Sequence, residues 1–392
     1  MEFNPLSPEF RLNPYPFYDM LRTHVPIFFW EPWQFTFLSG YDDCATLLRD
    51  NRLGRGHFDD SMAPASQKDL VRMQADWMLL KDPPDHTRLR GLVYKAFTPR
   101  MVEQLRATIQ TITDQLLDKV QAQGEMDLIA DLAYPLPVTV IAEMLGIPLD
   151  AREQFHDWSN ALALTLDLTE DTAVYDNGSL AAARFTEYLA DLAEERRRSP
   201  QNDLLSALVS VEEAGDHLTA NELYATCALL FVAGHETTIN LIGNGTLALL
   251  RHPDQLALFK REPGVVKTAV EEFLRYDSPV QMTARVVLEE MEYKGHTFRP
   301  GSQIAFLLGA ANHDPERFEN PAQLDITRQK NQHLSFGGGI HYCLGAPLAR
   351  LEGEIAFTTL LRRMPNLQLD IETPEYTNNY LLRGLKSLPV TF

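Results

Sequence analysis

The residues best suited to chemistry lie in a glycine-rich stretch at 333–352. Three consecutive glycines, Gly337 to Gly339, open backbone conformations that other residues avoid, so a flat molecule can approach closely. Cys343 follows, and the apolar spacing of 344–364 predicts an amphipathic helix. A cysteine at a helix start meets unpaired N–H groups and the positive end of the dipole, which favour the metal-binding thiolate. The alternative is a glycine loop around a structural cysteine.

A second chemical group falls within a long predicted helix. A capping box at 219–222 begins a helical pattern that runs to about Arg251, with Ala233-Gly234-His235-Glu236-Thr237-Thr238 in its middle. Glycine and adjacent β-branched threonines weaken a helix, so this stretch predicts a functional kink with room for water or a ligand. The zinc-protease pattern H-E-x-x-H is excluded because its fifth residue is Ile239. An irregular packing site without chemistry is the remaining alternative.

Composition limits the possible classes of function. The chain has 392 residues, 45% of them hydrophobic, and a formal charge of −19, which argues against a nucleic-acid partner. Its three cysteines, Cys44, Cys227 and Cys343, are far apart and suit a reducing cytoplasm better than a disulfide framework. The longest apolar run, 225–234, is about half the length of a membrane span, so no membrane anchor is expected. Because no linker or repeat marks a boundary, residues 1–392 are predicted to form a single domain.

The elements that must position these groups are mostly helices. A hairpin is predicted at 28–38, and short strands with turns at Lys294-Gly295 and Pro300-Gly301 are predicted between 285 and 308. Weak periodicity at 166–179 predicts a mobile connection. The predicted fold class is therefore mainly α with small β-sheets. Helices are predicted to end near Arg22, to begin near Asp82 with prolines in the first turn, and to cover 41–49, 100–123, 138–145, 151–165, 180–198 and 264–276.

These motifs resemble those of the cytochrome P450 family over nearly the whole chain. Phe336, Gly339, Cys343 and Gly345 fit the family's cysteine-ligand loop, F-x-x-G-x-x-x-C-x-G. The hexapeptide 233–238 matches all positions of its oxygen-activating motif, and 82–90 matches D-P-P-x-H-x-R-L-R. The resemblance implies the cytochrome P450 fold, with haem b between the long central helix and the cysteine-ligand loop.

The same resemblance implies a role for each matched residue. Cys343 would be the axial ligand of the haem iron, and Glu236 and Thr237 would relay the protons that O2 activation consumes. Glu272 and Arg275 fit the family's E-x-x-R, a buried pair that supports the cysteine loop. Taken alone, His86 and Arg90 would be interpreted as solvated residues on one helix face. Only the match of the surrounding sequence 82–90 to the family's motif favours a contact with haem instead. The cofactor contacts implied are His86, Arg90, Arg285 and His341 at the propionates, with Phe336, Gly345, Ala349 and Ala233 nearer the ring.

One family feature is expected to be missing. An arginine in a P-E-R-F segment often completes a triad with E-x-x-R. Pro315-Glu316-Arg317-Phe318 has these letters, but its spacing from the cysteine loop is wrong. The equivalent segment is 321–324, in which Gln323 would replace the arginine, so Arg317 receives no role in the triad.

The implied activity is that of a bacterial, cytoplasmic haem-thiolate monooxygenase that uses O2 and two external electrons. Because no flavin or iron–sulfur region is evident, the electrons would come from a separate ferredoxin or flavodoxin with its reductase, and the enzyme is expected to be a monomer. A non-enzymatic haem-thiolate sensor is the alternative, but it has no need of Glu236 and Thr237. Five cations could form a basic patch on which the electron donor docks, or each could be an ordinary solvated residue: Arg88, Lys95, Arg328, Lys330 and Arg350.

The predicted substrate pocket is apolar, which implies a lipophilic substrate. The strings 234–242 and 281–286 look especially like the bacterial group that holds macrolide hydroxylases and the biotin-pathway fatty-acyl cleaving enzyme of bacilli. This favours a fatty acid or fatty-acyl chain, with polyketides, macrolides and steroids as alternatives. Parts of 60–78 and 160–180 would complete the pocket, with a lid at 166–179. Its predicted lining is Leu229, Leu230, Ala233, Val280, Gln281, Met282, Leu381 and Leu382.

Overall fold

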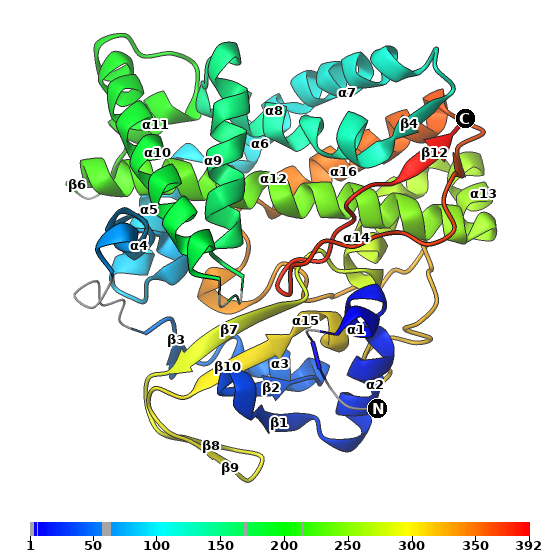
Figure 1. The fold of residues 1–392 in the computed structure, drawn as a ribbon, viewed down its shortest axis with the longest axis horizontal. Helices are drawn as coiled ribbons and strands as arrows, with labels where there is room; N and C mark the ends of the chain where they lie inside the picture. The colour runs from blue at the N-terminus through cyan, green and yellow to red at the C-terminus, as the bar shows by residue number, and fades with distance from the viewer. Residues whose placement is uncertain (1–3, 6, 57–63, 168, 170, 214) are drawn as a thin grey trace. The chain divides into compact units, whose positions relative to one another are not determined.

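The computed structural model describes residues 4–5, 7–56, 64–167, 169, 171–213 and 215–392. The chain divides into two compact units, and each is described separately below. Unit 1 comprises residues 1–54, 109–136 and 237–392, and unit 2 comprises 55–108 and 137–236. Helices dominate and the sheets are small, which confirms the predicted fold class (Figure 1). The single domain stays a prediction.

Unit 1 contains a five-stranded sheet in the order β1-β2-β10-β7-β3 (Figure 1). The strands β1 (Ile27–Trp30) and β2 (Phe35–Leu38) form the predicted hairpin. In the middle of the sheet, β10 (Gln303–Leu307) pairs in parallel with β2 and antiparallel with β7 (Met282–Val287). The short strand β3 (Leu53–Gly54) closes the other edge. Segments that are far apart in the unit 1 sequence therefore share one sheet.

A small hairpin extends from this sheet, as predicted. Its strands are β8 (Met291–Tyr293) and β9 (His296–Phe298), and its turn residues Lys294 and Gly295 have φ of 48° and 80°. Positive φ at both central positions is what a tight two-residue hairpin requires. The side chains of Tyr293 and Lys294 both bind Asp43 of α3 (Tyr41–Leu47), so the hairpin is fastened to a helix.

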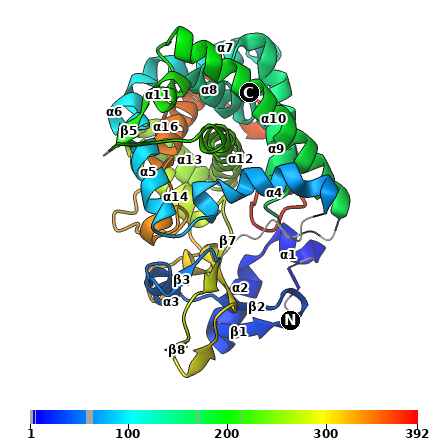
Figure 2. The ribbon, with the colours of Figure 1, turned by 90° about the vertical axis from the view of Figure 1, so that its left-hand side faces the viewer.

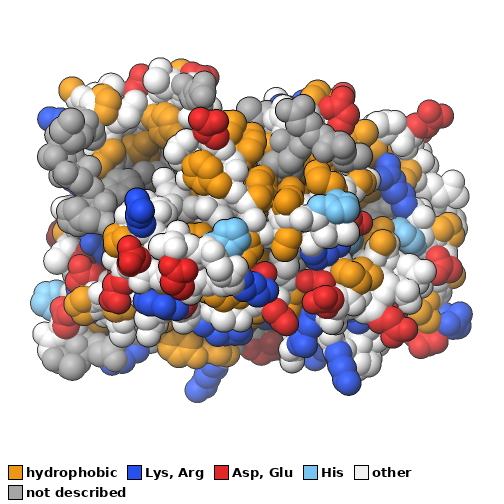
Figure 3. Space-filling view, turned by 90° about the horizontal axis from the view of Figure 1, so that it is seen from below, with side chains coloured by type: hydrophobic (Ala, Val, Ile, Leu, Met, Phe, Trp, Pro, Cys, Tyr) orange, Lys and Arg blue, Asp and Glu red, His pale blue; other side chains and the backbone are white. Residues whose placement is uncertain are grey.

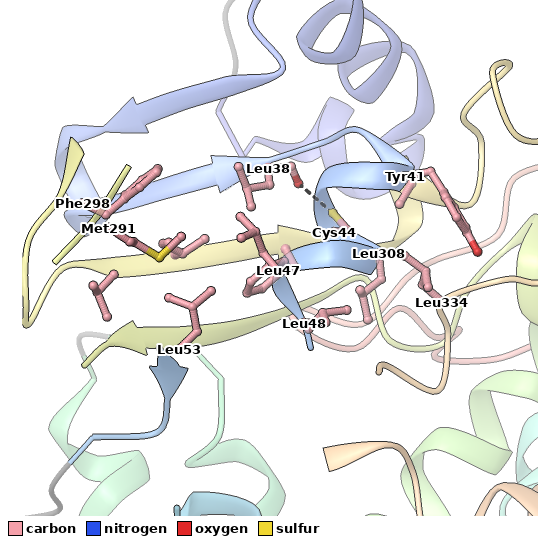
Figure 4. Packing of buried hydrophobic residues seen from close by; sticks show 14 of the residues in the cluster. Leu38, Tyr41, Cys44, Leu47, Leu48, Leu53, Met291, Phe298, Leu308 and Leu334 are labelled. Carbon is pink, nitrogen blue, oxygen red and sulfur yellow. Dashed lines mark hydrogen bonds between the residues drawn. The ribbon is translucent and has the colours of Figure 1, made fainter. Parts of the chain in front are cut away.

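A buried apolar cluster joins the sheet of unit 1 to α3 (Figure 4). Leu38, Leu47 and Leu308 are among its members, and Cys44 lies within it with its thiol donating to the Leu38 oxygen at 3.5 Å. Leu334, at the start of the glycine-rich stretch, packs into the same cluster. The base of that stretch is therefore anchored in the core.

Later helices of unit 1 lie against the C-terminal part of the long helix α12 (Ala220–Arg251), which begins in unit 2 and is seen nearly end-on in Figure 2. Two of them, α14 (Val266–Tyr276) and α16 (Ala346–Arg363), pack directly on each other. A second sheet has the order β11-β12-β4. The remaining α-helices and β-strands described in this unit are α1 (Pro8–Leu12), α2 (Tyr15–His24), α7 (Arg106–Val120), α13 (Pro253–Arg261), α15 (Leu308–Ala311), β4 (Glu125–Asp127), β11 (Gln368–Leu369) and β12 (Pro389–Thr391).

Unit 2 is almost entirely helical. Its longest helix, α10 (Thr172–Arg198), packs against α9 (Arg152–Leu164) and α4 (Lys68–Ala75). A separate short hairpin joins β5 (Glu212–Glu213) to β6 (Asp216–His217). The other α-helices described in this unit are α5 (Asp85–Ala96), α6 (Pro99–Gln104), α8 (Pro135–Leu145) and α11 (Leu204–Ser210).

Two predicted boundaries were wrong. The helix predicted at 100–123 is divided into α6 and α7, because the Leu105 N–H bonds to the Val102 oxygen at 3.0 Å and the chain turns there. Most of the connection predicted at 166–179 is helical, since α10 begins at Thr172 with Asp171 as its N-cap. Gly178 lies so close to α9 that a Cβ would come within 2.3 Å of Thr165 Cγ2. Tertiary packing therefore stabilises a helix that periodicity did not indicate.

Among the described residues, α12 alone is long and apolar enough to cross a membrane, and 67% of its apolar window is buried inside the structure. This burial is typical of a core helix in a globular protein. The helix is continuous through 233–238, and the predicted kink in this stretch stays a prediction. On the face shown in Figure 3, acidic, basic and apolar side chains are interspersed, and no broad area carries one sign of charge.

Candidate functional site

The glycine-rich stretch folds into a loop that ends at Cys343, just before α16. The Cys343 N–H donates to the Phe336 oxygen at 3.0 Å, which closes the loop. Gly337 and Gly339 have φ of 69° and 67°, a region that costs other residues about 1–2 kcal/mol. A Cβ on Gly339 would lie 2.3 Å from the Leu48 carbonyl oxygen. Glycine is therefore required by both conformation and contact, and the loop holds Cys343 at the helix start.

Cys343 differs from the other cysteines in its surroundings. Cys343 is exposed, whereas Cys44 and Cys227 are buried. Burial raises the pKa of the Cys227 thiol to about 12, so that thiol stays protonated and binds metal poorly. Beside Cys343, Ile340 and Tyr342 are 45% and 41% exposed. An accessible thiol amid exposed apolar side chains fits a flat, apolar cofactor held by a thiolate.

Charged side chains also hold the cysteine loop in place. The Arg350 guanidinium lies over the Phe336 ring, 4.5 Å from its centroid, and binds Glu271 of α14 at 2.6 and 2.9 Å. His333 contacts the same carboxylate at 3.2 Å. Burial alone would raise the pKa of Glu271, but the hydrogen bonds from His333 and Arg350 lower it to about 2. The carboxylate therefore stays ionised and links α14, the loop and α16.

The E-x-x-R residues form a fully buried ion pair on α14, with Arg275 donating to Glu272 at 2.7 and 2.8 Å. Arg328 adds a third contact, since its Nε donates to Glu272 at 3.0 Å. Gln323 contributes its backbone oxygen to Arg275 at 3.1 Å. The prediction that Gln323 replaces the second arginine of the triad was therefore wrong, because Arg328 supplies that guanidinium. The exclusion of Arg317 was correct: its side chain bonds to Gln332 instead.

This network also fixes the segment that leads into the cysteine loop. The Asn331 side chain donates to Glu272 at 3.0 Å. Farther along, the Leu334 N–H donates to Asn312 Oδ1 at 2.7 Å, and the Ser335 hydroxyl to the Leu274 oxygen at 2.6 Å. Since Arg275 donates to the Asn312 backbone oxygen at 2.9 Å, the ion pair and the loop segment share a partner.

One face of α12 is open although most of the helix is buried. Leu230, Ala233, Gly234 and Thr237 are each partly or fully exposed, and their i, i+3, i+4, i+7 spacing places them on one stripe. Glu236 is partly exposed beside them, and burial raises the pKa of its carboxyl. A glutamic acid that keeps its proton to higher pH suits a group that passes protons on.

His235, within the same motif, is a core residue. Its Nδ1 lies 2.8 Å from the Phe231 oxygen, and burial lowers its pKa to about 4. The imidazole is therefore neutral at physiological pH. The rings of Phe231 and His156 lie near it within unit 2, with centroids 5.8 and 6.1 Å from that of His235.

Thr238 is buried and hydrogen-bonds Glu352 of α16, a residue that the sequence reasoning missed. Burial raises the pKa of Glu352 to about 8, against the lowering effect of this hydrogen bond. A signal was present in the sequence, because Leu348, Leu351, Glu352 and Ile355 have the i, i+3, i+4, i+7 spacing of one buried helix face. The acid therefore occupies a core position on the helix that follows Cys343.

The predicted propionate partners are distributed over both units. In unit 2, His86 is buried and Arg90 partly buried, one turn apart on α5. In unit 1, Arg285 is buried on β7, which lies between β10 and β3 in the sheet. Its Nη1 donates to the Ala284 oxygen at 2.8 Å, and His341 lies in the cysteine loop. Each unit therefore provides one histidine and one arginine of the predicted set.

The structure brings together part of the predicted pocket lining in unit 1. The Gln281 N–H donates to the Leu381 oxygen at 2.8 Å, and Val280 and Leu382 form an isolated β-bridge. Val280, Leu381 and Leu382 are partly exposed. The Gln281 side chain is instead buried and accepts a hydrogen bond from the Tyr18 hydroxyl at 2.8 Å.

Other predicted lining residues differ in accessibility. Leu230 and Ala233 lie on the open stripe of α12, whereas Leu229 and Met282 are buried. Parts of two predicted lining segments, residues 60–63, 168 and 170, lie outside the described residues.

Three cations of the proposed docking patch are engaged within their own units. Arg88 binds Glu222 and lies 3.5 Å from Asp216, while Arg328 and Arg350 are bound as described above. Lys95 and Lys330 are exposed. Paired arginines present less charge to a partner than their number suggests.

Comparison with known proteins identifies the family of the chain. The sequence profile described as "Cytochrome P450" matches residues 17–262 and 264–382. The polyketide biosynthesis cytochrome P450 PksS of Bacillus subtilis is 44% identical over 402 residues, covering 99% of this chain and 98% of the relative. The biotin biosynthesis cytochrome P450 of the same organism is 44% identical over 389 residues, covering 98% of each chain. The crystal structure of P450BioI in complex with hexadec-9Z-enoic acid ligated acyl carrier protein has a TM-score of 0.93 and 44% identity, covering 98% of this chain and 99% of that one. The chain therefore belongs to the cytochrome P450 family of haem-dependent monooxygenases.

Proposed function

We propose that this cytochrome P450 hydroxylates a fatty acid or fatty-acyl chain, with Cys343 as the axial ligand of its haem iron. Enzymes of the family use haem b, O2 and electrons from a redox partner to oxygenate lipophilic substrates. The observation that carries the proposal is the exposed Cys343 at the start of α16, in a loop shaped by Gly339 against Leu48. No other cysteine offers an accessible thiolate, because Cys44 and Cys227 are buried.

The residues that would hold haem b have the required chemistry. Bound haem supplies O2 activation, which a thiolate ligand promotes by donating electron density to the iron. His86, Arg90, Arg285 and His341 would bind its two carboxylates. The contacts with the ring would come from Phe336, Gly345, Ala349 and Ala233.

Glu236 and Thr237 would deliver the protons. The raised pKa of Glu236 keeps a proton on its carboxyl closer to neutral pH, and its partial exposure lets it exchange with water. Thr237 lies on the open stripe of α12 and would pass that proton onward through its hydroxyl. An acid with no partner hydroxyl would transfer protons less directly.

The proposed substrate class is supported by chemistry and by relatives. Leu230, Ala233, Val280, Leu381 and Leu382 provide accessible apolar surface. A fatty-acyl chain is supported by the similarity to P450BioI, whose structure holds a fatty acid on an acyl carrier protein. A polyketide is the second candidate, supported by the similarity to PksS.

Further properties belong to the same proposal. The enzyme would take its electrons from a separate ferredoxin or flavodoxin and its reductase, and would act as a single-domain monomer. Its three widely spaced cysteines, two of them buried, support a reducing cytoplasm as its location.

Titration of the haem-loaded ferric protein in visible light tests the substrate class. A substrate that displaces water from the iron shifts the main haem band to shorter wavelength, and we expect a saturable shift with hexadec-9Z-enoic acid. A shift only with a macrolide or a steroid would assign the enzyme to those substrates instead.

The ligand assignment is tested by Cys343→Ala, which should abolish the thiolate signature in the spectrum. The matched control Cys227→Ala, which removes a buried thiol, should keep it. A thiolate spectrum in Cys343→Ala would exclude Cys343 as the ligand.

A further inference from the structure

Arg383 is a buried arginine in the C-terminal segment of unit 1, only 8% exposed. Its Nε donates to Asp277 Oδ1 at 2.7 Å, and its two Nη atoms donate to the backbone oxygens of Arg11 at 2.5 Å and Leu12 at 3.1 Å. Its guanidinium also lies over the Tyr376 ring, 3.7 Å from the centroid. One side chain therefore holds the N-terminal segment, the end of α14 and the C-terminal segment together.

The backbone of Arg383 is fixed as firmly as its side chain. Its N–H donates to the Pro279 oxygen at 2.8 Å, and its oxygen accepts from Asn244 Nδ2 of α12 at 2.9 Å. Immediately before it, residues 381–382 lie against 280–281 through the hydrogen bond and the β-bridge described above. The turn that carries two predicted pocket residues therefore ends at this anchor.

Gly384 allows the same turn to lie directly on α12. A Cβ at Gly384 would come within 1.8 Å of Asn240 Oδ1. Asn240 and Asn244 follow Thr237 by three and seven residues, so all three share one face of the helix. The turn at 381–384 is therefore seated on the helix face that carries the proposed proton-relay threonine.

We infer that Arg383 is a positioning residue that determines where a lipophilic chain lies beside Thr237, and hence which carbon is hydroxylated. This inference rests on the proposed function, because it needs a substrate that contacts Leu381 and Leu382. Arginine suits the task since its planar fork donates in several fixed directions while its face stacks on a ring, which lysine cannot do. A displacement of about 1 Å in a positioning element can change a rate by about 100-fold, so small movements of the turn have measurable effects.

The first test compares Arg383→Lys with Arg196→Lys in the full-length, haem-loaded enzyme. Arg196 is a matched control, because it is equally buried and binds Asp203 at 2.7 Å and the Gly146 oxygen at 2.9 Å in unit 2. Both variants should lower the thermal unfolding midpoint. Only Arg383→Lys should weaken binding of hexadec-9Z-enoic acid, by about tenfold, and change the ratio of hydroxylated positional isomers. Unchanged binding and isomer ratio in Arg383→Lys, or equal changes in Arg196→Lys, would overturn the inference.

A second test moves the turn without touching Arg383. Gly384→Ala should push the turn away from Asn240 and change the isomer ratio, and the double variant Gly384→Ala/Asn240→Ala should restore it by removing the clashing atoms. A Gly384→Ala variant with the wild-type ratio, or a double variant no closer to wild type, would contradict the inference. Absence of a fatty-acid shift in the wild type would refute the proposed substrate class, and the inference with it. A normal wild-type shift with an unaltered Arg383→Lys would refute the inference alone.

Discussion

The Arg328 guanidinium lies 3.0 Å from the Glu272 carboxylate, which also binds Arg275 on its own helix. One buried carboxylate thus joins α14 to the segment that leads into the cysteine loop. A buried charge costs several kcal/mol when it is left without partners, so the two arginines together make this arrangement stable. The cysteine loop depends on a network whose second guanidinium comes from Arg328, a residue outside the recognised motif.

Arg328→Met should destabilise the protein by about 3 kcal/mol, because it leaves the buried Glu272 with one guanidinium in place of two. Urea unfolding would measure this loss, and the yield of haem-loaded protein should fall with it. Arg317→Met is the control: its exposed side chain bonds to Gln332, and its removal should cost less than about 0.5 kcal/mol. Equal stabilities of the two variants would show that Arg328 is not part of the supporting network.

The glycines of the cysteine loop should differ in their tolerance of alanine. Gly337→Ala should cost about 1–2 kcal/mol, because only its positive φ is strained and nothing lies within 4 Å of the new Cβ. Gly339→Ala should cost more and lower haem retention, since its Cβ would also meet the Leu48 carbonyl oxygen. Thermal unfolding and haem content would rank the two. A Gly337→Ala variant as damaged as Gly339→Ala would show that the contact with Leu48 is unimportant.

Thr237→Ala should keep the haem and the thiolate spectrum but lose coupling. We expect product formed per reductant consumed to fall by about tenfold or more, with hydrogen peroxide as the alternative product, because the hydroxyl that passes protons is missing. Thr246→Val is the matched control on the same helix, since Thr246 is buried and bonds to the Ile242 oxygen. Full coupling in Thr237→Ala would remove Thr237 from the proton relay.

Glu352→Gln should change how stability depends on pH. Burial raises the pKa of Glu352 from 4.5 to about 8, so between these values the folded protein binds one proton more than the unfolded chain. The stabilisation from this group is therefore complete below the unfolded pKa and is lost as pH rises toward 8, at about 1.4 kcal/mol per pH unit.

Free energies of unfolding measured in urea across this pH range should fall more steeply for the wild type than for Glu352→Gln. In the wild type, the hydrogen bond from Thr238 lowers the pKa of Glu352. Thr238→Val removes this bond and should therefore raise that pKa further, so that the decline in stability extends to higher pH. Parallel curves for wild type and Glu352→Gln would mean that this carboxyl titrates at its ordinary pKa.

The sequence alone predicted those structural features whose signals come from residues that are neighbours in the chain. Gly337 and Gly339 adopt the positive φ that the glycine run predicts, and Lys294 and Gly295 form the predicted tight turn. The long helix is also readable, because its capping box and apolar pattern lie within one continuous segment. The Cys343 loop belongs to this class, since its glycines, its cysteine and the following helix are neighbours in the chain.

Tertiary structure decided what depends on residues that are distant in sequence. Arg328 rather than Gln323 binds Glu272, although both lie in an irregular segment where spacing does not predict which side chain reaches inward. The start of α10 depends on the close packing of Gly178 against Thr165. Arg383 binds Asp277 and Arg11, which are 106 and 372 residues away. Short-range periodicity predicts which face of an element is buried, but only the packed fold determines which partners meet there, because those contacts form between segments whose separation in the chain carries no local signal.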